Sequence, residues 1–155
     1  MSFAELLNIH ERLDELFLLH QESLLRLDLE MAAERLRIYD RELRAHIQVE
    51  EDLLMPVYER AGKIAGGPPE FFTGEHRRML EFLARFAAAL DELKGASGDP
   101  ARGAIRLFDE EAAFKSLCEH HDMREGAIFF PALDRVTDKT ERRDLIDRCF
   151  TANSQ

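Results

Sequence analysis

The stretch from His46 to Pro56 reads HIQVEEDLLMP, and a second stretch from His121 to Pro131 reads HDMREGAIFFP. In each stretch a glutamate follows the histidine by four positions and a proline follows it by ten. Positions i and i+4 are neighbours on one face of an α-helix. The repeat therefore predicts two equivalent helices, each presenting a histidine and a glutamate on the same face.

Apolar residues on both sides of these stretches recur every three or four positions, which is the period of an amphipathic helix. The strongest breaks are GKIAGGPP at 62–69 and GASGDP at 95–100, and Asp28 is a suitable N-cap after a weaker break. No segment shows the Val/Ile/Thr-rich alternation of a β-strand. We therefore predict an all-α fold with helices at about 3–26, 28–61, 69–94 and 100–134, and a short fifth helix at about 138–150.

Short connections make consecutive helices antiparallel neighbours. The prediction is an up-down-up-down four-helix bundle in which the two copies of the repeat lie on the second helix of each of two related hairpins. No linker is long enough to separate a second domain, so residues 1–155 are predicted to form one domain. A chain of this length buries enough surface to fold without a disulfide or a metal.

The composition excludes several classes of partner and mechanism. Lys and Arg number 21 against 31 Asp and Glu, which gives a net charge of −10 and disfavours nucleic acid and membrane surfaces. No apolar run approaches the ~18 residues of a membrane span, and the acidic start does not resemble a signal peptide. The only cysteines, Cys118 and Cys149, form no disulfide framework, so we expect a cytoplasmic protein. There is no glycine-rich phosphate loop, no G-x-S-x-G and no C-x-x-C.

The histidines of the repeat fall on the apolar faces of their helices. At about 100° per residue, His46 lies within about 20° of Leu53, and His121 lies within about 20° of Ile128. The glutamate four positions after each histidine points the same way. The repeat is therefore expected to direct polar side chains into the core of the bundle.

The rise of an α-helix predicts that four inward histidines lie at one level. His10 and His46 lie about 17 and 19 residues from the expected turn near residue 27, or ~25–28 Å at ~1.5 Å per residue. His76 and His121 lie about 21 and 24 residues from the expected turn near residue 97. One histidine from each helix then reaches a common level, beside the glutamates of both repeated stretches.

A hydrogen-bonded core or surface residue is the ordinary interpretation of a single histidine on a helix. Two buried carboxylates beside four imidazoles are different, because each carboxylate costs several kcal/mol without a counter-charge. Two metal cations remove that cost. Carboxylate and imidazole ligands inside a four-helix bundle are typical of dinuclear iron or manganese sites, whereas a structural zinc usually takes a closed four-ligand site.

These motifs resemble the hemerythrin-like (HHE cation-binding) domain family over residues of about 5–134. The resemblance rests on HERLDELF from His10, HIQVEE from His46, EHRRM from Glu75 and HDMRE from His121, with the two prolines. It implies a non-haem centre of two iron ions. The ligands that it implies are His10, His46, His76 and His121 as terminal ligands, with Glu50 and Glu125 bridging. Zinc or manganese can substitute at such a site.

The sequence departs from the oxygen-carrying members of that family at Leu80, where they have a further histidine. One iron then has an open position or a water, so simple oxygen carriage does not follow. We expect a protein that binds or senses a small diatomic ligand, oxygen or nitric oxide, or that handles iron. The alternatives are a di-iron oxidoreductase or iron–sulphur cluster repair protein, and a structural helical module with a vestigial site. A monomer and a homodimer are both compatible with the sequence.

Three further polar residues lie near this set. His20 is ~15 Å along the helix from His10, so we expect a partly buried residue that binds no metal. His120 points about 100° away from His121, which favours a solvated or outer position. Asp14 follows His10 by four positions, and either orients an imidazole or pairs with an arginine.

Overall fold

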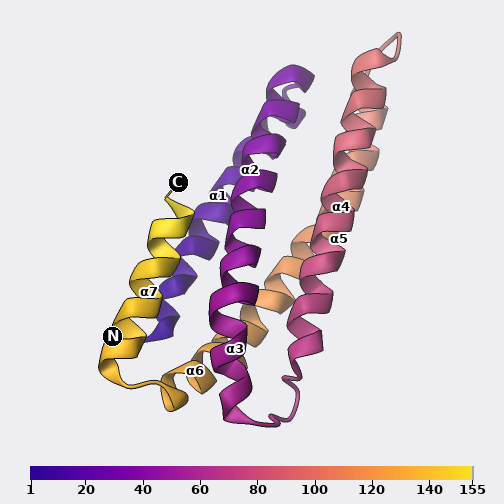
Figure 1. Cartoon of the computed structure of the whole chain (residues 1–155). Coiled ribbons are helices and arrows are strands. Elements are labelled where there is room, and N and C mark those ends of the chain that lie inside the picture. The colour runs from indigo at the N-terminus through magenta and orange to yellow at the C-terminus, as the bar shows by residue number, and fades with distance from the viewer. Residues whose placement is uncertain (155) are drawn as a thin grey trace.

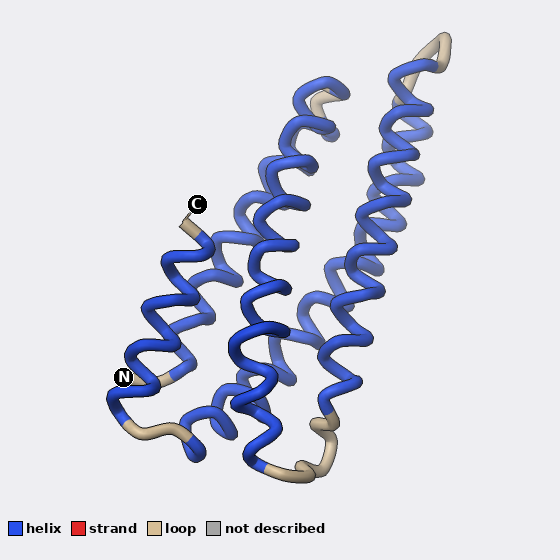
Figure 2. The backbone as a smooth tube through the Cα atoms, in the orientation of Figure 1, coloured by secondary structure: helices blue, strands red, loops and turns tan. Residues whose placement is uncertain are grey.

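The computed structural model describes residues 1–154, which are helical along most of their length and contain no strand (Figure 2). The long helices are α1 (Leu7–Leu25), α2 (Leu29–Val49), α4 (Pro69–Gly95) and α5 (Ala101–Arg124). The shorter elements are η1 (Phe3–Leu6), η2 (Glu50–Leu54), α3 (Met55–Tyr58), η3 (Glu59–Ala61), η4 (Glu125–Phe129), α6 (Phe130–Val136) and α7 (Lys139–Asn153). The predicted all-α fold is confirmed, and the predicted fifth helix corresponds to α7.

The long helices form two hairpins that lie side by side (Figure 1). α1 packs on α2, α4 packs on α5, and α2 packs on α4 across the two hairpins. The short helices α3 and α6 lie at one end of this helical bundle, and the turns between α1 and α2 and between α4 and α5 lie at the other. None of the helices among residues 1–154 is both long and apolar enough to cross a bilayer.

The turn between α1 and α2 occurs where the sequence predicts it. Leu27 adopts a φ of 57°, which reverses the chain, and the side chain of Asp28 accepts a hydrogen bond of 3.1 Å from the Met31 amide. That bond satisfies one of the free donors at the start of α2. The heights of the histidines in the first hairpin therefore depend on a well-defined turn.

The connection from α3 to α4 packs tightly against the end of the bundle. The Tyr58 hydroxyl donates a hydrogen bond to the carbonyl of Gly67, which is itself buried. A Cβ atom at Gly67 would lie 2.5 Å from Cγ2 of Ile128, so only glycine fits this close approach. The connection thus closes the bundle at the end where α3 and α6 lie.

Two π-helical segments interrupt the helices that were predicted to be continuous over 28–61 and 100–134. The Met55 amide donates to the carbonyl of Glu50, and the Phe130 amide donates to the carbonyl of Glu125, in both cases five residues back. The residue after each of these two donors is a proline, Pro56 or Pro131, which has no amide hydrogen to continue the α-helical pattern. π-helical turns are rare and are found frequently at functional sites.

These segments correct one detail of the predicted core. Leu53 and Ile128 were expected to point inward, but both are only half-buried, and the following residues Leu54 and Phe129 are fully buried instead. A π-turn accommodates one extra residue, so every later side chain moves round the helix by one position. Both hairpins show the same shift, which again makes them equivalent.

Candidate metal centre

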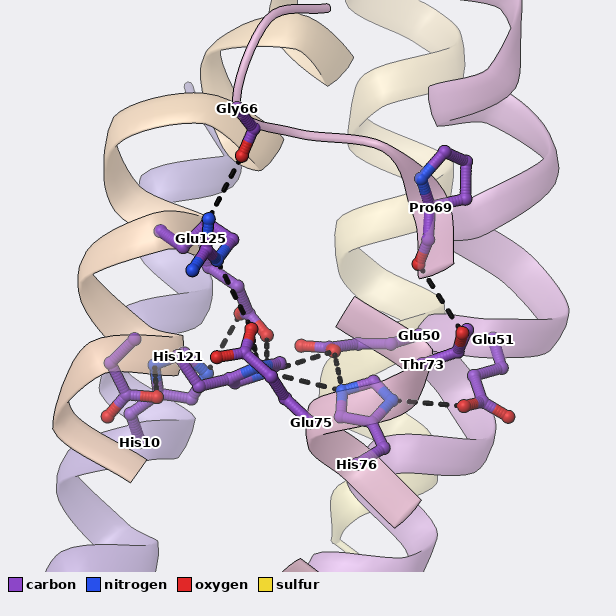
Figure 3. Close-up of polar contacts among 12 residues, drawn as sticks. His10, Glu50, Glu51, Gly66, Pro69, Thr73, Glu75, His76, His121 and Glu125 are labelled. Carbon is purple, nitrogen blue, oxygen red and sulfur yellow. Dashed lines mark hydrogen bonds and ion pairs between the residues drawn. The ribbon is translucent and has the colours of Figure 1, made fainter. Parts of the chain in front are cut away.

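The structure brings all six predicted site residues into one buried cluster between the two hairpins, and all of them but His46 are labelled in Figure 3. Each long helix contributes one histidine near the closed end of the bundle, and the first residue of each π-helical segment contributes a glutamate. The six residues are His10 of α1, His46 of α2, Glu50 of η2, His76 of α4, His121 of α5 and Glu125 of η4. None of the six is more than 6% exposed.

The histidines meet in pairs across each hairpin. Nε2 of His10 lies 3.2 Å from Nε2 of His46, and Nε2 of His76 lies 3.2 Å from Nε2 of His121. The common level predicted from helix rise is therefore observed. The Nε2 atoms of both pairs also contact the carboxylates of Glu50 and Glu125.

Glu50 connects the two histidine pairs. Its Oε1 lies 2.9 Å from Nε2 of His46 in its own hairpin, and its Oε2 lies 3.0 Å from Nε2 of His76 in the other. One carboxylate oxygen is thus directed to each pair. A carboxylate with this placement can bridge two cations.

Glu125 has the equivalent position in the second hairpin. Its Oε1 contacts Nε2 of His121 in its own hairpin, and its Oε2 lies 3.2 Å from Nε2 of His10 in the other. The result is two groups of four candidate ligands, within each of which the ligand atoms lie within 4.8 Å of one another. Both groups contain both glutamates, one with His10 and His46 and the other with His76 and His121.

Several buried atoms of the cluster lie within ion-pair distance of an imidazole or a carboxylate but have no partner in good hydrogen-bond geometry. Among residues 1–154 these are Nδ1 of His10, Oε1 of Glu50 and both carboxylate oxygens of Glu125. Burying a carboxylate oxygen without a partner is costly, and native proteins rarely do so. Metal cations between the histidine pairs would satisfy these oxygens, so the donor set fits a pair of metal ions.

The electrostatics of the cluster favour positive charge at its centre. Burial raises the pKa of Glu50, but the charges and close polar contacts of His46 and His76 outweigh burial and hold this pKa well below its usual value. Burial lowers the pKa of His10, but the close contact and charge of Glu125 outweigh it and raise this pKa to about 9. A cluster that stabilises protonated imidazoles in this way attracts metal cations for the same reason.

A family model for the hemerythrin HHE cation binding domain matches residues 1–133. The chain belongs to this family. The family relationship and the buried histidine–glutamate cluster agree on a helical protein with a site for metal cations.

Similar curated proteins are longer than this HHE domain. The uncharacterized protein Rv1995 of Mycobacterium tuberculosis and the uncharacterized protein Mb2018 of Mycobacterium bovis are each 33% identical over 102 residues. The match covers 66% of this chain and 38% of each relative, so the chain spans less than half of their length. No solved structure matches the chain significantly.

Three histidines of the HHE domain contact an acidic side chain through the other ring nitrogen. Each acidic residue lies next in sequence to a residue of the cluster and contacts a histidine on a different helix. Its position beside a cluster residue is the only feature of the sequence that points to it. Sequence reasoning did not identify them. The pairs are Glu51 with His76 at 3.0 Å, Glu75 with His121 at 3.4 Å and Asp122 with His10 at 3.2 Å.

Such outer carboxylates fix the orientation of a metal-binding imidazole. Among residues 1–154, Nδ1 of His46 has no carboxylate contact of this kind. Asp14, which was considered for such a role, is exposed, and Asp122 takes the position beside His10 instead. The four imidazoles are therefore not held equally.

Glu75 also connects the cluster to the surface. Its Oε1 accepts a hydrogen bond of 3.2 Å from Nε of Arg124, whose Nη1 donates to the carbonyl of Gly66 at 3.0 Å. The same Glu75 oxygen lies 3.4 Å from His121. The imidazole of His121 is thus oriented by the connection that closes the bundle.

Aromatic rings cover the cluster toward the closed end of the bundle. Phe130 lies 6.2 Å from the ring of His10, and Phe72 lies 6.2 Å from the ring of His121. Phe129 packs against both Phe72 and Phe130. Leu80, the position where the oxygen-carrying members have a further histidine, is half-buried against the core.

The remaining histidines lie outside the cluster. His120 is exposed, as expected. His20 was expected to be partly buried, but it is fully buried: its Nδ1 donates to the Ala32 carbonyl at 2.8 Å, and its Nε2 lies 2.6 Å from Oε2 of Glu111. The pairing was missed because Glu111 is 91 positions away on α5.

Proposed function

We propose that this HHE domain holds two iron ions and binds or senses a small diatomic ligand, oxygen or nitric oxide, or handles iron. The observation that carries the proposal is the placement of Glu50 and Glu125, each of which directs one carboxylate oxygen to each histidine pair. His10, His46, His76 and His121 would be the terminal ligands of the two ions. Zinc and manganese are the competing metals for such a donor set.

The residues of the chain would hold and shield the metal pair. Bound iron would supply a redox-active centre with room for a small ligand. The proposal takes the bundle as up-down-up-down, so that each hairpin provides half of the site. The aromatic and aliphatic side chains around the cluster exclude bulky substrates, because all six cluster residues are buried.

The buried carboxylates of Glu50 and Glu125 oppose the view that the site is vestigial. A purely structural module would be more stable with apolar residues in their place, since a buried ion pair is often less stabilising than well-packed apolar side chains. A di-iron oxidoreductase or an iron–sulphur cluster repair protein would use the same metal ligands. It would differ from a binding protein in converting its substrate over repeated cycles. The net charge of −10 supports a small-molecule ligand over nucleic acid or a membrane surface, and the free cysteines support a cytoplasmic location.

The test is the metal content of the protein after expression in iron-rich medium, combined with its electronic spectrum. We expect close to two iron ions per chain, near-ultraviolet bands in the oxidised form, and a spectral change when the reduced protein meets nitric oxide. Sustained consumption of peroxide by the iron-loaded protein would favour the oxidoreductase. A protein that binds neither iron nor zinc nor manganese would contradict the proposal.

A further inference from the structure

A groove on the surface runs between α1 and α5, the two long helices that close the circle of the bundle. Its outer part is lined by Leu18 and Gln21 of α1 and by Lys115 and Glu119 of α5. The volume open to the centre of a water-sized sphere is about 270 Å³. The groove is thus large enough to admit several water molecules.

A second, much smaller cavity lies directly against the cluster. It is bounded by all four cluster histidines, and its volume by the same measure is about 20 Å³. A volume of about 10–15 Å³ is enough for one water. The inner cavity therefore accommodates one water or a molecule of two heavy atoms.

The groove and the inner cavity share part of their walls. The shared residues are Asp14 of α1, Tyr39 of α2, and Cys118 and Asp122 of α5. Because the same side chains line both spaces, small movements of these side chains would join them. The groove would then connect the inner cavity to solvent.

Two of the shared wall residues are hydrogen-bond donors. Burial, together with the neighbouring Cys118, raises the pKa of Tyr39 well above its usual value. Burial also raises the pKa of the Cys118 thiol to about 12. Both side chains line the inner cavity, and the contact between them uses one of their two hydrogens. The other hydrogen is free for an acceptor atom of a ligand in that cavity.

The mouth of the groove carries more negative than positive charge. The acidic residues at the mouth are Asp14 and Glu119, and the basic residue is Lys115. Asp122 lies further in, beside His10. A mouth of this sign lowers the local concentration of anions and has little effect on neutral molecules. The charges therefore select against small anions.

We propose that the groove between α1 and α5 is the entrance to the metal pair, with Tyr39 and Cys118 as its inner gate, and that it admits a neutral molecule of two heavy atoms that can accept a hydrogen bond. The nature of the ligand rests on the proposed function. The entrance itself does not, because its walls are defined without any metal.

The first test measures access to Cys118 in the protein as purified. In a Cys149→Ala variant, Cys118 is the only thiol, and its reaction is followed by intact mass. The reagents are neutral methyl methanethiosulfonate and a matched pair of its ethyl derivatives, one with an anionic sulfonate and one with a cationic trimethylammonium group. Rates are compared between reagents and between variants of the folded protein, because the raised pKa of the Cys118 thiol slows its reaction with all of the reagents.

We expect the neutral reagent to react fastest and the anionic derivative to react about tenfold slower than the cationic one. An Asp14→Asn/Glu119→Gln variant should reduce that tenfold difference. The control is Cys118→Ala, in which the buried Cys149 should stay unmodified. Equal rates for the anionic and cationic derivatives, unchanged in the Asp14→Asn/Glu119→Gln variant, would overturn the proposed entrance.

The second test blocks the groove. Leu18→Trp adds bulk at its lining, and Ala84→Trp adds the same bulk in a groove of about 240 Å³ between α2 and α4, which shares no wall residue with the inner cavity. We expect Leu18→Trp to slow both Cys118 modification and the nitric-oxide-induced spectral change of the iron-loaded protein about tenfold. Ala84→Trp should change neither rate.

Unchanged rates in Leu18→Trp would mean that ligands reach the cluster elsewhere and would contradict the proposal. Failure of the proposed function would give a different result from failure of the proposed entrance. If the protein takes up no metal, the spectral arm gives no signal, but the order of the thiol reagents and the effect of Leu18→Trp on Cys118 still decide whether the entrance exists.

Discussion

Glu50 and Glu125 are equivalent residues of the two hairpins: each begins a π-helical segment, and each contacts one histidine of its own hairpin and one of the other. Both are fully buried, with at most 2% of either residue exposed. The two hairpins are therefore joined at the cluster by carboxylates as well as by apolar packing. This arrangement leads to four predictions that do not depend on the identity of the exogenous ligand.

Glu50→Gln and Glu125→Gln should each reduce binding of both metal ions. Each substitution keeps the shape of the side chain but removes the charge that faces both histidine pairs. We expect the metal content measured by native mass spectrometry to fall from about two ions per chain toward none. Glu110→Gln, an exposed change on α5, is the matched control. Full retention of one ion in either variant would show that the carboxylate serves a single metal.

His10→Ala and His20→Ala should separate metal binding from stability. His10→Ala removes a candidate terminal ligand, so it should lower the occupancy of one metal. His20→Ala should leave the metal content unchanged but destabilise the fold by about 3–5 kcal/mol, because Glu111 loses its partner in the core. Metal analysis and denaturant unfolding measure the two effects.

The control for this pair is a double variant, His20→Leu/Glu111→Leu. Replacing both members of a buried pair by apolar residues of similar size is often neutral, so the double variant should recover most of the lost stability. If His20→Ala lowered the metal content and His10→Ala did not, the assignment of His10 to the centre would be wrong.

Glu75→Gln should weaken metal binding without changing the number of ions. The carboxylate lies between His121 and Arg124, and loss of its charge removes the group that orients the imidazole. We expect the metal dissociation constant to rise about 10- to 100-fold, measured by competition with a chelator. Glu92→Gln, exposed on the same helix, should have no effect. Equal affinities for all three proteins would rule out an orienting role.

Removal of the metal should lower the melting temperature while the helices remain. Metal ions that bind the folded chain stabilise it by about 2.7 kcal/mol at a free concentration of 100 times the dissociation constant. The apo protein keeps its apolar core, so circular dichroism should still show a helical fold that melts earlier. Identical melting curves for the apo and metal-loaded protein would favour a structural module.

The sequence by itself determined the positions of the helices and the level of the histidines. Both follow from properties of the local chain: the 3.6-residue period places His46 and His121 on apolar faces, and a constant rise per residue brings His10 opposite His46 once Asp28 starts the second helix. The closely spaced repeat also showed which glutamates accompany the histidines. These are short-range regularities, and a single sequence contains them.

Only the tertiary structure decided which residues surround the histidine–glutamate cluster. The π-helical segments exchange Leu53 for Leu54 and Ile128 for Phe129, a shift that helical periodicity does not contain. The pairing of His20 with Glu111 depends on how α1 and α5 pack, because their side chains meet across 91 positions of sequence. Contacts between helices are set by how their surfaces fit in three dimensions, and spacing along one helix carries no information about which side chain lies opposite on another.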